Sequence, residues 1–187
     1  MVDPGADVEA IVQIMRDHDR VPEAILLTHG HADHIAGNAG LRELWPRLPI
    51  WVGKGDANML TDAVANLSAP FGMPLLSPPA DHLLSHLQEI RIAGLDLEVR
   101  DAPGHSPGHI VYVYRGSSPW VVFGGDVLFQ GSVGRTDFPG GSFEVLAASI
   151  EEQLFTLPDD TLVFSGHGRP TTIGREKQSN PFVGLGS

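Results

Sequence analysis

The chain has 187 residues and a mass of 20.0 kDa, the size of one ordinary domain with enough interior to bury a core. Lys and Arg total 12 against 23 Asp and Glu, a formal charge of -11, so the surface repels a phosphate backbone and we expect no nucleic-acid partner. The absence of cysteine excludes disulfides, thiolate metal sites and a cysteine nucleophile. Any metal must therefore be held by His, Asp or Glu, and the nine histidines are the feature to explain.

The composition is that of a soluble globular protein. No apolar run approaches the roughly 18 residues that a membrane helix needs, so we expect no membrane partner. The start, Met1 to Pro4, shows no basic region followed by an apolar stretch, which predicts a cytoplasmic location. No repeat, charge block or low-complexity linker divides the chain. We therefore expect a single domain over residues 1–187.

The first half of the chain mixes helical and strand patterns. Apolar residues at helical spacing predict a helix over residues 7–18. The apolar run at 24–28 predicts a buried strand that ends at a His-rich stretch. A second strand is expected at 50–52, with Asp56 as a candidate cap of a following helix. The proline-rich stretch 68–79 predicts a loop.

The second half continues the alternation. Residues 90–99 alternate around Gly94 and predict a hairpin with one buried face. Further strands are expected at 110–114, 120–123 and 161–164, and a long helix over 143–154 with Ser142 as its N-cap. Interleaved strands and helices, with polar residues at three strand ends, predict an α/β fold with a site along one sheet edge.

The densest chemical signal is His29-Gly30-His31-Ala32-Asp33-His34, with four potential ligands on a turn after a strand. Histidines this close would repel one another when protonated and lose hydration when buried, whereas a divalent cation binds them as neutral imidazoles. A solvated His-rich loop is the alternative, and the ligand density disfavours it.

Three further candidates each follow a predicted strand beside a glycine: His105, Asp126 and His167. Glycine lets the backbone turn sharply and approach a site closely. Taken singly, each residue has an ordinary explanation as a loop histidine or a turn cap. Together with the His-rich stretch they supply seven ligands, enough for two metals if one carboxylate bridges.

This ligand pattern resembles the metallo-β-lactamase superfamily, which carries an H-x-H-x-D-H loop followed by separated His, Asp and His ligands, and the resemblance covers nearly the whole chain. It implies an αββα sandwich with two metals at one edge of the packed sheets. It also implies a role for each residue: His29, His31 and His105 on the first metal, Asp33, His34 and His167 on the second, and Asp126 bridging them.

Within that superfamily, the segments Gly131 to Pro139, Gly166-His167-Gly168, Thr171 to Gly174 and Asn180-Pro181-Phe182 resemble the compact glyoxalase II branch. Its members, the hydroxyacylglutathione hydrolases, cleave thioesters such as S-lactoylglutathione. The resemblance implies a small-molecule thioester substrate, with Arg135 contacting the thiol carrier. The alternative for Arg135 and Asp137 is a solvated charged pair on a surface loop, and we expect Asp137 to be structural.

The ligand set predicts the chemistry. Two cations about 3.5 to 4 Å apart can share a hydroxide that attacks the thioester carbonyl at neutral pH. Asp33 is the candidate catalytic residue, because a carboxylate beside that hydroxide can orient it or accept its proton. We expect zinc, with iron or manganese also compatible with His and Asp ligands.

Other histidines and other functions remain open. His109 is expected to orient a ligand from behind, whereas His18, His82 and His86 are expected at the surface. The alternatives to a thioester hydrolase are an iron-dependent persulfide dioxygenase, a family that shares the segment Gly134 to Phe138, and a non-catalytic metal-binding scaffold. β-Lactam or lactone hydrolysis would use the same hydroxide.

Members of the superfamily have a strand pair before the segment that matches Val2 to Gly5, whereas Met1 here begins almost at that point. By this resemblance we expect about thirty residues, including that N-terminal strand pair, to be absent. Their loss would leave an open sheet edge, which invites pairing with another chain. We therefore expect either upstream strands in the complete gene product or a homodimer through that edge.

Overall fold

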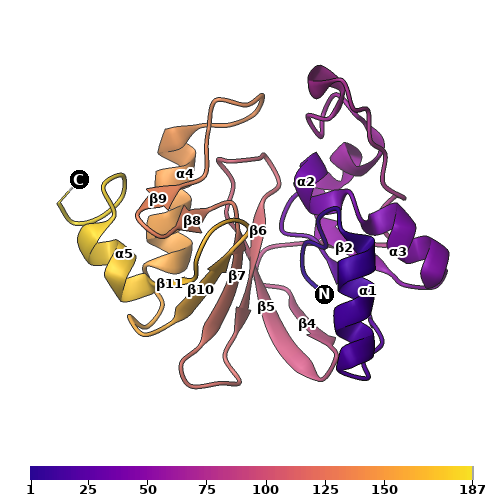
Figure 1. Ribbon diagram of the computed structural model, residues 1–187. Helices are drawn as coiled ribbons and strands as arrows, with labels where there is room; N and C mark the ends of the chain where they lie inside the picture. Colours follow the sequence, from indigo (N-terminus) through magenta and orange to yellow (C-terminus); the bar gives the residue numbers. More distant parts are fainter. Residues whose placement is uncertain (187) are drawn as a thin grey trace. The chain divides into compact units, whose positions relative to one another are not determined.

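The computed structural model describes residues 1–186 (Figure 1). The chain forms two compact units, Met1–Leu84 and a second that starts at Ser85, and each is described by itself below. The expectation of a single domain over residues 1–187 stays a prediction.

The first unit is built around a parallel sheet of three short strands in the order β1-β2-β3. The isolated residue Val2 adds a parallel bridge to Leu26 beside β1. The elements are α1 (Val8–Asp17), β1 (Ile25–Leu26), α2 (Ala32–Ile35), α3 (Asn38–Leu44), β2 (Ile50–Gly53), the 3-10 helices η1 (Lys54–Thr61) and η2 (Ala69–Phe71), and β3 (His82–Leu84).

The local sequence explains most of this unit. Asp7 caps α1 by accepting a hydrogen bond from the Ala10 N–H at 3.0 Å, which confirms the predicted helix. The predicted strands at 24–28 and 50–52 are β1 and β2. Asp56, however, does not cap a helix: it lies inside η1 with its side chain fully buried. The core of the unit consists of Ile25, Leu27, Ile35, Leu41, Leu48, Ile50, Val52 and Leu60.

The second unit contains a six-stranded sheet in the order β11-β10-β7-β6-β5-β4 and a separate hairpin of β8 and β9. Its elements are β4 (Glu89–Ile92), β5 (Leu95–Asp101), β6 (Ile110–Tyr114), β7 (Val121–Gly125), β8 (Leu128–Phe129), β9 (Ser132–Val133), α4 (Phe143–Ser149), the π-helix η3 (Ile150–Leu154), β10 (Leu162–Ser165), β11 (Thr171–Thr172) and α5 (Ile173–Ser179). The predicted hairpin around Gly94 is β4 and β5, paired antiparallel.

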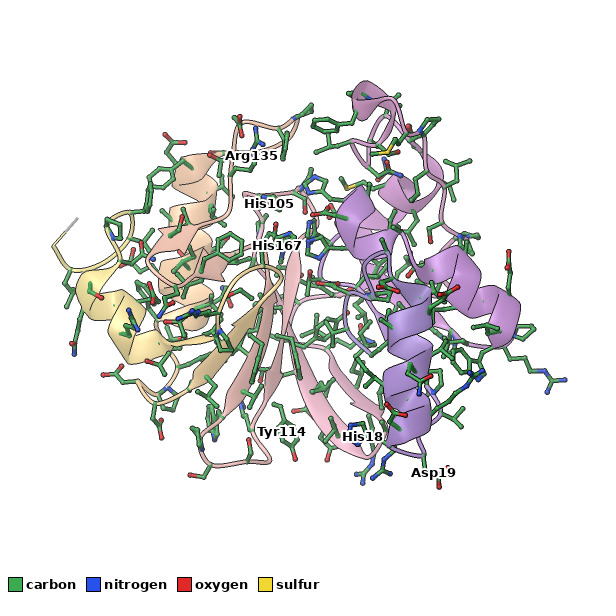
Figure 2. All side chains as sticks on the ribbon, viewed as in Figure 1. His18, Asp19, His105, Tyr114, Arg135 and His167 are labelled. Atoms are coloured by element: carbon green, nitrogen blue, oxygen red, sulfur yellow. The ribbon has the colours of Figure 1, made fainter. Side chains whose placement is uncertain are left out.

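The direction of the strands gathers three loops at one end of this sheet. β5 and β7 both run antiparallel to β6, and β10 runs parallel to β7, so β5, β7 and β10 all point the same way. Their carboxyl ends therefore share one edge. Figure 2 shows His105, His167 and Arg135 at this end of the unit and Tyr114, the last residue of β6, at the other.

α4 and α5 lie on the same side of the six-stranded sheet (Figure 1). Ser142 caps α4 as predicted, accepting from the Val145 N–H at 3.3 Å, and the predicted helix over 143–154 is α4 continued by η3. Leu146, Ile150 and Leu154 pack into one core with sheet residues such as Val122. Within residues 1–186, no helix is long and apolar enough to cross a membrane.

Candidate metal centre

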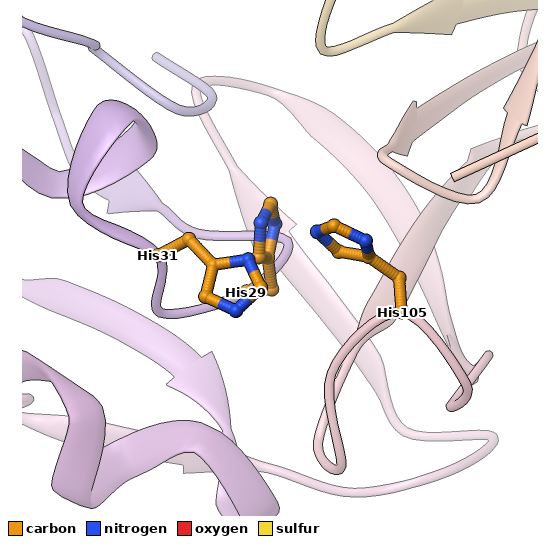
Figure 3. A group of neighbouring side chains, drawn as sticks. All are labelled: His29, His31 and His105. Atoms are coloured by element: carbon orange, nitrogen blue, oxygen red, sulfur yellow. The ribbon is translucent and has the colours of Figure 1, made fainter. Parts of the chain in front are cut away.

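In the first unit, the predicted ligands follow the end of β1 and continue into α2. His29, His31 and His34 are buried, whereas the Asp33 side chain is 58% exposed. The His29 ring centroid lies 4.7 Å from that of His31 and 4.1 Å from that of His34. Figure 3 shows His29 and His31 on this loop, and His105 on the loop after β5 of the second unit. Three buried histidines are therefore packed together after one strand.

A carboxylate that the sequence interpretation missed supports this loop from behind. Asp3 accepts hydrogen bonds from the Thr28 N–H at 2.8 Å and the Thr28 hydroxyl at 2.7 Å. Its second oxygen also lies 3.0 Å from Nδ1 of His34, and one ligand atom each of Asp3, His29 and His34 lie within 4.8 Å of one another. Because the Thr28 hydroxyl donates to Asp3, it accepts from Nδ1 of His29, 3.1 Å away.

These contacts determine which ring nitrogen can bind a metal. When Nδ1 donates its proton to an oxygen, Nε2 keeps its lone pair. In both His29 and His34, Nδ1 lies against an oxygen, so Nε2 is the nitrogen that could bind a metal. An oxygen acceptor behind each histidine is the arrangement found around metal-binding imidazoles.

Gly30, between the first two histidines, is held by a second buried carboxylate. Its N–H donates to Oδ2 of Asp56 at 3.1 Å. A Cβ at Gly30 would lie 2.6 Å from Cβ of Met59, so only glycine fits between the two ligands. η1 thus positions the His29 to His31 turn. The sequence does not reveal this contact, because Asp56 is 26 residues from Gly30.

In the second unit, one carboxylate oxygen faces two histidines. Oδ2 of Asp126 lies 3.7 Å from Nε2 of His105 and 3.6 Å from Nε2 of His167. Both distances exceed the about 2.7 to 3.2 Å of a hydrogen bond. They are close to the roughly 3.3 Å between neighbouring ligands of a tetrahedral ion with bonds of about 2.0 to 2.1 Å. Each histidine is thus at a co-ligand distance from Asp126, although the three side chains come from three different loops.

His105 is also in the tautomer that a metal requires. Its Nδ1 donates to the backbone carbonyl of Arg135 at 2.8 Å, which leaves Nε2 toward Asp126. His109 has the opposite arrangement, because its Nε2 accepts the Asp126 N–H at 3.1 Å. It contacts the backbone of a predicted ligand, as expected for a residue that orients a ligand from behind.

These two ligand sets fit divalent metals. The donors are imidazole nitrogens and carboxylate oxygens, which zinc, iron and manganese all accept, and Nδ1 of His29, His34 and His105 lies against an oxygen, so Nε2 is the nitrogen that could bind a metal. The ligand roles of His29, His31, Asp33, His34, His105, Asp126 and His167 stay predictions.

Arg135 and Asp137 form an exposed bidentate pair, with Nε to Oδ1 at 2.8 Å and Nη2 to Oδ2 at 2.7 Å. The hydrogen bond from Arg135 lowers the pKa of Asp137 to about 2, so the pair stays ionised across the neutral range and is lost only as the pH falls toward that value. The guanidinium also lies 4.0 Å from the centre of the Phe138 ring. A substrate contact by Arg135 stays a prediction.

The histidines that were expected at the surface are exposed. These are His18, which lies at the end of α1 (Figure 2), His82 and His86. His82 stacks on Trp51 with 3.9 Å between ring centroids, and Nδ1 of His86 accepts the Asp101 N–H at 3.1 Å.

Comparison with known proteins decides the family. The sequence profile of the metallo-β-lactamase superfamily matches residues 1–167. The chain belongs to the metallo-β-lactamase superfamily. This membership confirms the predicted α/β fold and its family, and makes the protein a metal-binding hydrolase of that superfamily.

Three relatives within the superfamily bear on function. Hydroxyacylglutathione hydrolase GloC of Haemophilus influenzae is 37% identical over 98% of this chain and 86% of its own length. The crystal structure of BLEG-1 B3 metallo-β-lactamase has a TM-score of 0.91 and 42% identity over 97% of this chain and 87% of that one. TTHA1623, solved in a di-iron-bound form, has a TM-score of 0.84 and 37% identity with the same coverage of both chains.

Proposed function

We propose that this protein is a dinuclear metal-dependent hydrolase that cleaves a thioester, such as S-lactoylglutathione, to a carboxylic acid and a free thiol. The observation that carries the proposal is the position of Asp126, whose Oδ2 lies 3.6 to 3.7 Å from Nε2 of two histidines. A carboxylate that bridges two cations needs such neighbours. The similarity to a hydroxyacylglutathione hydrolase supports the choice of a thioester.

The ligand assignment that we propose follows from membership in the superfamily and from the donor chemistry above. It gives one metal His29, His31 and His105, the other Asp33, His34 and His167, and both of them Asp126. Zinc is the expected metal, and the di-iron form of TTHA1623 supports iron as an alternative.

When bound, the two cations would lower the pKa of a coordinated water and so supply a nucleophile at neutral pH. Asp33 would orient the attacking water and accept its proton, since its carboxylate is 58% exposed and lies 3.7 Å from Nε2 of His34. One water is consumed, the C–S bond breaks, and the sulfur leaves as a thiolate that takes up a proton. A thiolate is a good leaving group and needs no strong general acid.

Arg135 is the proposed contact for the thiol carrier. Its guanidinium already binds a carboxylate, that of Asp137, in bidentate geometry, and it is 59% exposed. A carboxylate of the thiol carrier would take the place of Asp137 in that geometry.

The test measures hydrolysis of S-lactoylglutathione by the metal-free protein and by protein reconstituted with zinc, iron or manganese, following the loss of thioester absorbance. We expect metal-dependent turnover. Asp126→Asn should lower it by about 10²-fold or more, because the bridging charge is lost. His18→Ala, which alters an exposed histidine outside both ligand sets, should leave it unchanged. Absence of turnover in every metal form, or oxygen uptake with glutathione persulfide in its place, would contradict the proposal.

β-Lactam hydrolysis is a second candidate, favoured by the similarity to BLEG-1 B3 metallo-β-lactamase. The same reconstituted protein can be given a chromogenic cephalosporin. A kcat/KM for the cephalosporin above that for the thioester would favour this second candidate.

A further inference from the structure

Residues 63–80, between η1 and β3, form a segment that we call the apolar loop. It contains no Asp, Glu, Lys, Arg or His, although charged residues make up 19% of the chain. In Figure 1 the loop, coloured purple to magenta, lies next to α2 at the end of the first unit. Four of its large apolar side chains are mostly exposed: Val64 at 67%, Phe71 at 68%, Met73 at 73% and Leu76 at 61%. Large exposed apolar surface on a globular protein often marks a binding site.

The apolar loop is attached directly to the metal-ligand loop. The backbone carbonyl of Asn66 accepts the N–H of Ala32 at 3.0 Å, and Ala32 lies between His31 and Asp33. This hydrogen bond joins the loop to the segment that carries four of the predicted ligands. The apolar loop and the loop that carries His29 to His34 are therefore hydrogen-bonded neighbours within the first unit.

Buried polar side chains hold the loop in shape. The Asn66 side chain, fully buried, donates from Nδ2 to the Leu75 carbonyl at 2.9 Å and accepts from the Ser68 N–H at 3.0 Å. Ser68 Oγ in turn accepts the Leu75 N–H at 2.9 Å. Further along, Ser77 donates its N–H to the Leu60 carbonyl at 2.8 Å and accepts from Nδ2 of Asn38 at 2.9 Å. Both ends of the exposed stretch are thus fixed by satisfied hydrogen bonds.

The outward direction of the apolar side chains follows from this geometry. Leu75 packs against the core of the first unit, whereas the next residue, Leu76, points outward. The loop thus keeps one leucine for the core and presents Phe71, Met73 and Leu76 to the outside at positions set by Asn66 and Ser68. Fixed apolar surface binds an apolar ligand with little loss of conformational entropy.

We propose that the apolar loop binds the hydrocarbon acyl chain of the substrate and sets a preference for longer acyl groups; this inference rests on the proposed thioester hydrolase function. The loop carries no charge with which to bind the ionised groups of a thiol carrier such as glutathione. The acyl side of the thioester is the part whose methylenes such a surface can remove from water. The formal charge of -11 opposes docking on an anionic bilayer.

The test compares kcat/KM for glutathione thioesters with straight acyl chains from acetyl to hexanoyl, using the metal-loaded full chain. For the unaltered protein we expect kcat/KM to rise by about two- to fourfold for each added methylene. The double variant Phe71→Ser/Met73→Ser should lose most of this increase. The matched control is Ile14→Ser/Leu44→Ser, which changes two residues of the same unit that are 59% and 52% exposed and lie outside the loop. It should keep the full increase.

A binding measurement separates this proposal from the proposed function. S-Alkylglutathiones are thioethers that cannot be hydrolysed, and calorimetry measures how their Kd changes with alkyl length whether or not the protein turns over thioesters. We expect Kd to fall with each methylene, and the Phe71→Ser/Met73→Ser variant to lose that trend. A Kd independent of chain length, or a trend that the variant retains, would overturn the proposal. If the same substitutions instead abolish a concentration-dependent dimer while chain length has no effect, the loop is an interface between copies and the proposal is wrong.

Discussion

Side chains that hydrogen-bond to the predicted ligands determine how those ligands are oriented. The predicted ligands are visible in the sequence because four of them lie between His29 and His34. Asp3 is not, because its partners Thr28 and His34 are 25 and 31 residues away and the contact exists only after folding. The tautomer of His34 cannot be read from local sequence either, since it depends on the contact between Nδ1 and the distant Asp3 carboxylate. Ligand identity is thus predictable from local sequence, and ligand orientation is not.

Asp3→Asn is therefore expected to weaken metal binding without removing a ligand from the H-x-H-x-D-H loop. The amide keeps the shape of the side chain and loses the charge behind His34, which should lower metal affinity by about 10- to 100-fold. A competition titration against a chromophoric chelator measures this change. Asp19→Asn, at an exposed position after α1, is the matched control and should bind as the unaltered protein does. Equal affinities for the two variants would show that Asp3 does not support the centre.

Among the elements, those with a clear period in sequence were predicted well, and the short ones were not. The amphipathic helix α1, the hairpin of β4 and β5, and the helix after Ser142 lie where the pattern places them. β8, β9 and β11 have two residues each, too few to show a period, and they form because neighbouring strands or turns offer hydrogen bonds. The proline-rich stretch 68–79 was rightly predicted as a loop, apart from the single turn of η2. Composition did not reveal the hydrogen bond from the Ala32 N–H to the carbonyl of Asn66, just before this stretch.

The close packing of α4 against the loop before His105 requires a glycine at position 104, and this requirement can be tested. Gly104 has φ +126°, and a Cβ there would lie 2.4 Å from the backbone nitrogen of Leu146 in α4. Gly104→Ala should therefore lower the free energy of unfolding by about 2 to 6 kcal/mol, from backbone strain and overpacking together. Gly94→Ala is the control, because Gly94 has φ +78° and no atom within 4 Å of its Cβ position, so only strain of about 1 kcal/mol applies. Chemical denaturation compares the two, and equal losses would contradict a steric role for α4.

At the scale of the whole molecule, the α/β fold class and the family could be predicted from the sequence. Composition alone did not indicate a function. The formal charge of -11 argued against a nucleic-acid partner, and the absence of cysteine left His, Asp and Glu as the possible metal ligands. The superfamily profile over residues 1–167 then identified the family. Substrate and metal identity do not follow from the family, since relatives of similar identity include a hydroxyacylglutathione hydrolase, a B3 metallo-β-lactamase and a di-iron protein. A homodimer through an open sheet edge stays a prediction.

The measurement that tests the dinuclear centre most directly is the metal stoichiometry of the full chain. Protein saturated with zinc, freed of excess metal and analysed for elemental content should hold about two ions per chain, as seven ligands with one bridging carboxylate allow. Asp126→Ala should hold one or fewer while keeping its circular dichroism spectrum. A single zinc per chain in the unaltered protein, or two in Asp126→Ala, would contradict the bridging role of Asp126 on which the proposed mechanism depends.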